Sequence, residues 1–119
     1  MPVRSSSSSV LRWPDGDAVH TAFARWAEAT AQARPELRAA GYFGSYATGT
    51  WGVGSDLDVI LVVEESDVPF HERAGRWDLT GLPVPAEVLV YTRAEWQTLR
   101  NRGDRFGRML AEDTVWVVE

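Results

Sequence analysis

One stretch of this chain combines glycines, hydroxyl side chains and two carboxylates in a spacing that suits phosphate and metal chemistry. It runs from Gly44 to Asp58, and Asp56 and Asp58 stand at the head of a run (56–63) that is apolar after Asp58. If that run is a strand, its alternation puts both carboxylates on one face, with Cα atoms about 6.6 Å apart. Two acids so close raise each other's pKa unless a cation lies between them. The pair therefore predicts a site for Mg²⁺, which binds carboxylate and substrate phosphate oxygens.

The same stretch begins with a turn that suits an anion. Gly44 and Ser45 follow a predicted strand (38–43) and precede a predicted short helical segment (46–51). The free N–H groups at a helix start, together with the helix dipole, favour negative charge. Glycine allows a phosphate to approach the backbone closely, and the serine hydroxyl adds a donor. A nucleoside triphosphate with magnesium fits both the turn and the acidic pair.

Helices and strands must alternate around this stretch to position it. Apolar residues at helical spacing predict a first helix over 18–33, and Thr92 with Glu95 has the capping-box spacing of a helix that begins at Arg93. The unbroken apolar run after Asp58 predicts a strand covered on both faces. The remaining elements are expected as strands at 86–91 and 114–118, one or two helical turns within 70–77, and a continuation or restart of the last helix after Gly103. This order indicates an α/β or α+β domain in which helices cover a sheet.

The composition excludes several classes of chemistry. Among 119 residues the chain has 12 arginines, no lysine, 17 acidic residues and no cysteine, which gives a net charge of −5. Without cysteine there is no disulfide, thiol nucleophile or Cys-based zinc site, and without lysine there is no Walker-type phosphate loop. The negative charge argues against tight nonspecific binding to nucleic acid. A basic stripe, interpreted as a solvated helix face, is formed by Arg93, Arg100, Arg102, Arg105 and Arg108.

The chain is predicted to be one domain with a short extension. Residues 1–12 are expected to be a flexible N-terminal tail and residues 13–119 a single domain. The start, Met-Pro-Val-Arg followed by Ser5–Ser9, lacks the apolar stretch of a signal peptide. No apolar run approaches the roughly 20 residues of a membrane span. We therefore expect a cytoplasmic protein without a membrane partner.

The stretch 44–58 resembles the active-site signature of the DNA polymerase β-like nucleotidyltransferase superfamily. That signature is a Gly-Ser pair followed at fixed distance by Ser-Asp-x-Asp, and the spacing here is similar to that of the minimal nucleotidyltransferases. Each half of the signature is common by itself, whereas the two together before an apolar strand are specific. The resemblance implies the nucleotidyltransferase fold, a single α/β (α+β) domain whose small mixed β-sheet is flanked by helices.

The resemblance also assigns nucleotide-binding residues. Gly44 and Ser45 would hold the β- and γ-phosphates of the nucleotide. Ser55 belongs to the same nucleotide-binding signature, although a hydrogen bond that stabilises the turn explains its hydroxyl more simply. Trp51, inside the loop, is a candidate for stacking on a base or touching a partner.

By the same resemblance, Asp56 and Asp58 would bind two Mg²⁺ ions and act as catalytic residues. The family places a third carboxylate, normally Asp, on a neighbouring strand, and this chain offers Glu87 there, as catalytic residue and metal ligand. The substitution departs from the family pattern because Glu is one methylene longer and magnesium tolerates little distortion of its octahedral shell. A solvent-facing acid is the alternative interpretation of Glu87.

The implied function is magnesium-dependent transfer of a nucleoside monophosphate, AMP from ATP or the equivalent from another NTP, to a hydroxyl. Minimal members of the family are typically paired with a helical protein of the HEPN family and act as antitoxins that adenylylate a tyrosine of that partner. One alternative is a catalytically degenerate binding module that neutralises its partner by contact. Another is an enzyme of the antibiotic-nucleotidylating type that acts on a small molecule.

Overall fold

The computed structural model describes residues 13–119, so the predicted tail at 1–12 lies outside the described residues. The elements follow one another as α2 (Gly16–Ala33), β1 (Leu37–Phe43), α3 (Ser45–Thr48), β2 (Leu57–Val63), α4 (Phe70–Arg73), the 3-10 helix η1 (Ala74–Arg76), β3 (Ala86–Thr92), α5 (Arg93–Arg102), α6 (Arg105–Asp113) and β4 (Val115–Val118). The four predicted strands and the first predicted helix are confirmed, with ends that shift by no more than two residues.

The four strands form one mixed sheet in the order β3-β2-β1-β4. β2 and β3 run parallel, whereas β1 is antiparallel to both β2 and β4. The parallel pair requires a long crossover, which α4, η1 and the following loop supply. A small mixed sheet flanked by helices is the predicted architecture, and the structure confirms it.

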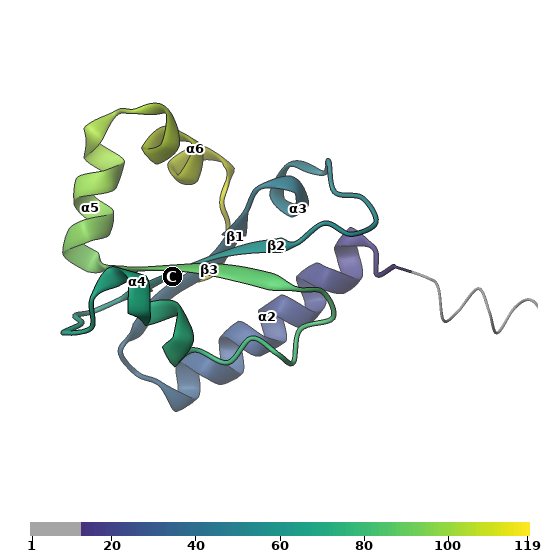
Figure 1. The fold of residues 1–119 in the computed structure, drawn as a ribbon, viewed down its shortest axis with the longest axis horizontal. Helices are drawn as coiled ribbons and strands as arrows, with labels where there is room; N and C mark the ends of the chain where they lie inside the picture. Colours follow the sequence, from purple (N-terminus) through teal and green to yellow (C-terminus); the bar gives the residue numbers. More distant parts are fainter. Residues whose placement is uncertain (1–12) are drawn as a thin grey trace, which may run out of the picture.

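Helices cover both faces of this sheet, as Figure 1 shows with α2 on one side and α5 and α6 on the other. The buried positions of α2, Val19, Phe23 and Ala27, join one core cluster with the alternate β2 residue Val59. Ile60, which points to the opposite face of β2, is fully buried in a second cluster with residues of α5 and α6. Burial of each such large side chain contributes roughly 1.5–3 kcal/mol. The β2 run is therefore apolar throughout because both of its faces are covered.

The last helical region is two helices. Thr92 and Glu95 form a complete capping box at the start of α5, as their spacing predicts. Gly103 ends that helix with φ +75, and Asp104 caps α6 by accepting a hydrogen bond from the Gly107 N–H. A side chain at position 107 would overlap the Leu99 carbonyl oxygen, so this glycine permits close packing of the two helices. Of the two alternatives that the sequence leaves open, continuation or restart after Gly103, the structure has the restart.

The predicted helical segment at 46–51 is shorter than expected. α3 spans Ser45–Thr48 and ends at Gly49, whose φ of +80 is the left-handed conformation that terminates a helix. The glycines that follow keep the rest of the loop out of helical structure.

Within residues 13–119, no helix combines the length and hydropathy that would be needed to cross a bilayer.

Candidate nucleotide-binding and catalytic site

The parallel pairing of β2 with β3 brings two of the predicted carboxylates together. Asp58 of β2 is the register partner of Glu87 of β3. The Leu57 N–H donates to the Pro85 carbonyl at 2.8 Å, which fixes this register at the start of both strands. Neighbouring strands lie about 4.8 Å apart, so the two acidic residues occupy adjacent backbone positions.

Asp56 lies just before β2 and not inside it. The side-chain alternation of a strand, from which the sequence predicts that Asp56 and Asp58 share one face, therefore does not apply to Asp56. The two carboxylates are nevertheless close enough to interact, because the charge of Asp56 raises the pKa of Asp58. Asp56 and Glu87 are exposed, and Asp58 is half-buried.

Gly44 lies against the Asp58 carboxylate from the side of β1, opposite to Glu87 on β3. Phe43, the last residue of β1, pairs with Asp58, and the chain then turns through Gly44 with φ +75. A Cβ atom built at position 44 would overlap Asp58 Oδ2. Glycine is therefore required here both by the backbone conformation and by the close approach of the carboxylate.

Electrostatics in this cluster favour a cation. Burial raises the pKa of Asp58 first, and the negative charges of Glu87 and then Asp56 raise it further. Within residues 13–119, the carboxylates of Asp56, Asp58 and Glu87 form no ion pair and no hydrogen bond with another side chain that would offset their mutual repulsion. A divalent ion beside Asp58 would remove the repulsion, and carboxylate oxygens are the donors that Mg²⁺ prefers.

The donor chemistry thus fits a metal, but the side chains are not gathered around one point. No group of three His, Cys, Asp or Glu side chains in the described part of the chain has the arrangement of a metal site. Because Asp56 and Glu87 are exposed, rotation of their side chains is unobstructed by packing.

The loop between Gly44 and Asp58 is held by its aromatic residues. Tyr46 is buried and stacks on Trp51, with ring centroids 5.6 Å apart and 8° between the planes. Its hydroxyl accepts a hydrogen bond from Trp13 Nε1 at 2.9 Å and donates to the Ser55 carbonyl at 3.4 Å. Trp51 is half-buried in this stack, so its indole supports the loop. This role of Tyr46 has no signal in the sequence, because its partners at positions 13 and 51 follow no regular spacing.

The two serines of the signature have different surroundings. The Ser55 hydroxyl accepts a hydrogen bond from the Gly52 N–H at 2.8 Å, which is the turn-stabilising role that the sequence favours. Ser45, at the start of α3, is partly exposed, and its hydroxyl makes no hydrogen bond within residues 13–119. Ser45 is therefore the serine whose hydroxyl is available to a ligand.

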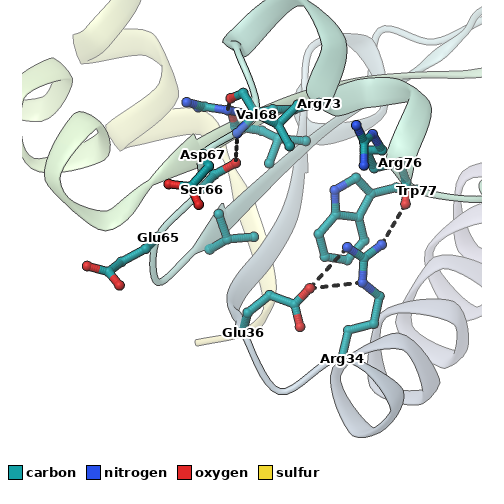
Figure 2. A pocket seen from close by; sticks show the side chains of 11 residues that line it. Arg34, Glu36, Glu65, Ser66, Asp67, Val68, Arg73, Arg76 and Trp77 are labelled. Atoms are coloured by element: carbon teal, nitrogen blue, oxygen red, sulfur yellow. Dashed lines mark hydrogen bonds and ion pairs between the residues drawn. The ribbon is translucent and has the colours of Figure 1, made fainter.

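A hollow of about 480 Å³ lies at the opposite end of β2, beyond Val63, and Figure 2 shows it from close by. The Arg34 guanidinium lies flat over the Trp77 ring, with Cζ 3.4 Å from the ring centroid. It also donates to the Arg76 carbonyl and pairs with Glu36 at 3.0 Å. None of the residues around this hollow belongs to the predicted site, so it is separate from the acidic cluster.

Comparison with known proteins places the chain in a family. The sequence model of the nucleotidyltransferase domain family matches residues 27–110, which include all six predicted site residues. No curated protein matches the chain.

Two solved structures share the fold. The first is a putative nucleotidyltransferase from Sulfolobus solfataricus, with TM-score 0.60 and 19% identity over 85% of this chain and 80% of that chain. The second is a toxin–antitoxin structure with AMP-PNP, with TM-score 0.53 and 16% identity over 79% of this chain and 71% of that chain. Because the family model covers most of its length, this protein belongs to the nucleotidyltransferase domain family of enzymes.

Proposed function

We propose that this protein transfers a nucleoside monophosphate, AMP from ATP in the preferred case, to a hydroxyl group with the support of Mg²⁺. The observation that carries the proposal is the juxtaposition at the start of β2. There Asp58 lies beside Glu87, and Gly44 leaves room for the Asp58 carboxylate, which a Cβ atom at position 44 would displace.

Gly44 and Ser45 are the proposed phosphate-binding residues. Gly44, which is partly exposed, lies against Asp58, and the free Ser45 hydroxyl is on the next residue. A triphosphate held there would present its α-phosphorus to the acidic cluster. Ser55 contributes by fixing the turn that precedes Asp56.

Asp56, Asp58 and Glu87 are the proposed ligands of two Mg²⁺ ions, which when bound would lower the pKa of the acceptor hydroxyl and neutralise the triphosphate. The contribution of the chain is to hold three carboxylates at the starts of two adjacent strands. The charges of Glu87 and Asp56 raise the pKa of Asp58 in the free protein. The same negative charges are the proposed source of the affinity for a divalent cation.

In the proposed reaction the acceptor oxygen forms a bond to the α-phosphorus. The bond from that phosphorus to the oxygen that bridges to the β-phosphate breaks, and pyrophosphate leaves. Glu87, an exposed carboxylate on the edge strand, is the proposed acceptor of the hydroxyl proton. Most of the rate enhancement would come from positioning and charge stabilisation.

The proposed acceptor is a tyrosine of a HEPN-type toxin, with this protein in the antitoxin role. Two observations support this choice: the resemblance to the minimal nucleotidyltransferases, and the fold shared with a toxin–antitoxin structure that contains AMP-PNP. The cytoplasm is the compartment we propose, since ATP and Mg²⁺ are both available there.

One structural observation favours a second candidate, a binding module without catalysis. The three carboxylates do not converge on a common point within residues 13–119. Such a module would bind its partner by contact and would not consume nucleotide.

Transfer of label from α-labelled ATP into a lysate of the source cell, with Mg²⁺ present, tests the proposal. We expect a labelled product with the wild-type protein and with Asp67→Asn, because Asp67 is an exposed acid outside the site. We expect no labelled product with Asp58→Asn.

Two outcomes would contradict the enzymatic proposal. The first is equal labelling by wild type and Asp58→Asn, which would place the activity elsewhere. The second is no labelling with any of the nucleoside triphosphates while a partner protein still co-purifies, which would establish the binding module.

A further inference from the structure

A second surface feature lies on the same sheet face as the acidic cluster, at the other end of β3. It is a groove of about 500 Å³ between α4, the end of β3, α5 and α6. Residues Ala94, Thr98 and Arg102 line it from α5, four positions apart, so one face of this helix forms its floor. Since α5 has ten residues, the groove extends along about 15 Å of helix.

Large apolar side chains stand at both ends of this groove. Phe70 of α4 is 43% exposed and Phe106 of α6 is 40% exposed. Within residues 13–119, the single other exposed large apolar residue is Val53, at 83%. The Phe70 ring contacts Tyr91 at 5.2 Å between centroids, which holds it at the wall of the groove. Exposed aromatic residues that converge on one groove are typical of a protein-binding surface.

The segment from the start of α5 into the first turns of α6 is locally basic in an otherwise acidic protein, although α6 ends with Glu112 and Asp113. Residues 93–108 carry five of the 12 arginines and two of the 17 acidic residues of the chain. Arg102 lines the groove and is paired with Asp104 at 2.6 Å. Arg105, at the start of α6 beside Phe106, forms no ion pair within residues 13–119. The chain has a net charge of −5, so this basic surface selects for a partner with acidic groups.

We infer that this groove binds an amphipathic helix of a partner protein, with apolar residues at i, i+4 and i+7 and acidic residues beside them. A helix of about three turns matches the length of α5 and would place apolar side chains between Phe70 and Phe106. Its acidic residues would face Arg102 and Arg105. The inference rests on the groove alone and holds whether or not the acidic cluster is catalytic.

The experiment uses the full chain and a fluorescent 12-residue peptide with Leu at positions 2, 6 and 9, Glu at most other positions and capped ends. Binding is followed by fluorescence anisotropy. We expect Phe70→Ser and Phe106→Ser each to weaken binding by about tenfold, as loss of an anchor residue does. Val53→Ser, an equally apolar change outside the groove, should leave binding unchanged.

Charge is tested in the same assay. Arg105→Glu should weaken binding, whereas Arg25→Glu, on the exposed side of α2 across the sheet, should not. Raising NaCl from about 50 to about 300 mM should weaken binding of the wild type, because salt screens exposed charges. A peptide with Lys in place of Glu should bind at least about tenfold more weakly.

Several results would overturn the inference. They are no binding of the acidic peptide, equal binding of the acidic and lysine peptides, and binding unaffected by both phenylalanine substitutions. Self-association that Phe106→Ser abolishes, measured by sedimentation, would assign the groove to a second copy of the chain. Retained circular dichroism and Tm in each variant would show that a loss of binding does not reflect unfolding.

Discussion

At the scale of single residues, the central feature is Asp58, whose surroundings disfavour the ionised form of its carboxyl group. Asp58 is half-buried, has Glu87 beside it on the next strand and Asp56 before it, and meets Gly44 from the third side. Burial and the charges of Glu87 and Asp56 disfavour the ionised form of this carboxyl group in the free protein. Groups held in this way are common at catalytic and metal-binding sites.

Gly44→Ala should therefore impair both folding and transfer activity. The backbone conformation of Gly44, φ +75 and ψ −150, is nearly exclusive to glycine and costs an alanine about 1–3 kcal/mol, and the overlap of its Cβ with Asp58 Oδ2 adds to this. Gly54→Ala is the matched control, since Gly54 has φ +88 but open space around its Cβ. We expect a larger loss of Tm in Gly44→Ala and loss of activity in that variant alone. Equal effects of the two substitutions would show that the contact with Asp58 is unimportant.

Asp58→Asn should stabilise the metal-free protein while it abolishes transfer. Removal of one of two adjacent like charges is worth roughly 0.2–1 kcal/mol, or about 1–4 °C in Tm. Mg²⁺ should raise the Tm of the wild type and leave that of Asp58→Asn unchanged, because ligand binding stabilises only the protein that binds. Thermal unfolding with and without Mg²⁺ checks both statements. A lower metal-free Tm in the variant would mean that Asp58 is structural.

Glu87→Gln should lower the transfer rate by about 10–100-fold, the usual effect of disturbing a metal ligand shell. Glu87→Asp keeps the charge and should retain more activity than Glu87→Gln. Rates of label transfer at saturating ATP compare the two, with Glu65→Gln as an exposed control. Full activity in Glu87→Gln would identify Glu87 as a solvent-facing acid.

At the scale of elements, one buried arginine joins three of them. Arg73 of α4 is 7% exposed and donates to the Val68 and Val90 carbonyls at 2.7 and 3.1 Å. It also forms a bidentate pair with Glu95, the capping-box residue of α5. The crossover, β3 and α5 are thus fixed by one side chain, which holds β3 and hence Glu87 in place.

Arg73→Met should destabilise the protein by about 2–3 kcal/mol, because hydrogen bonds to charged groups are lost and buried acceptors are left without a partner. Urea denaturation measures the loss. Arg76→Met, three residues later and exposed, is the control and should change the free energy of unfolding by less than about 0.5 kcal/mol. A similar effect of both substitutions would show that the buried network contributes little.

At the scale of the whole molecule, the two faces of the sheet have different roles. The α2 side holds the larger core cluster and the hollow beyond Val63, whereas the other side carries the acidic cluster at the starts of β2 and β3 and the apolar groove beside α5. Glu87 and Tyr91 point to the same side of β3, since they are separated by an even number of residues. A partner in the groove would therefore lie on the same face as the proposed catalytic residues.

Opposite pKa shifts should shape the pH dependence of stability. The Arg73 hydrogen bond lowers the pKa of Glu95, and hydrogen bonds from Arg93 and Arg38 lower that of Glu64. Their contribution is complete above the unfolded pKa, near 4.3, and is lost as pH falls through the folded pKa. Asp58 has the opposite sign, because its raised pKa makes the native state bind a proton more tightly.

Tm should therefore fall as the pH drops below about 4, and the advantage of Asp58→Asn over wild type should shrink as Asp58 becomes protonated. Calorimetry of both proteins from neutral to acidic pH, without metal, measures this. A difference in Tm that stays constant over the whole range would show that ionisation of Asp58 does not affect stability.

The sequence predicts well wherever a local rule applies. The capping box at Thr92 and the covered strand after Asp58 follow from neighbouring residues and are confirmed. The prediction fails where a neighbour in space decides. Trp51 lies against Tyr46 in a stack that no residue spacing indicates.

The amino-acid sequence by itself determined the family, and the phosphate- and metal-binding residues are proposed from it, because the spacing from Gly44 to Asp58 is a local property of the chain. The tertiary structure decided which of them meet. Glu87 lies 29 positions after Asp58, and only the register of β2 with β3 makes them neighbours. The groove between Phe70 and Phe106 likewise exists only after four elements pack together. Strand register and helix packing depend on contacts between distant segments, which local sequence patterns do not encode.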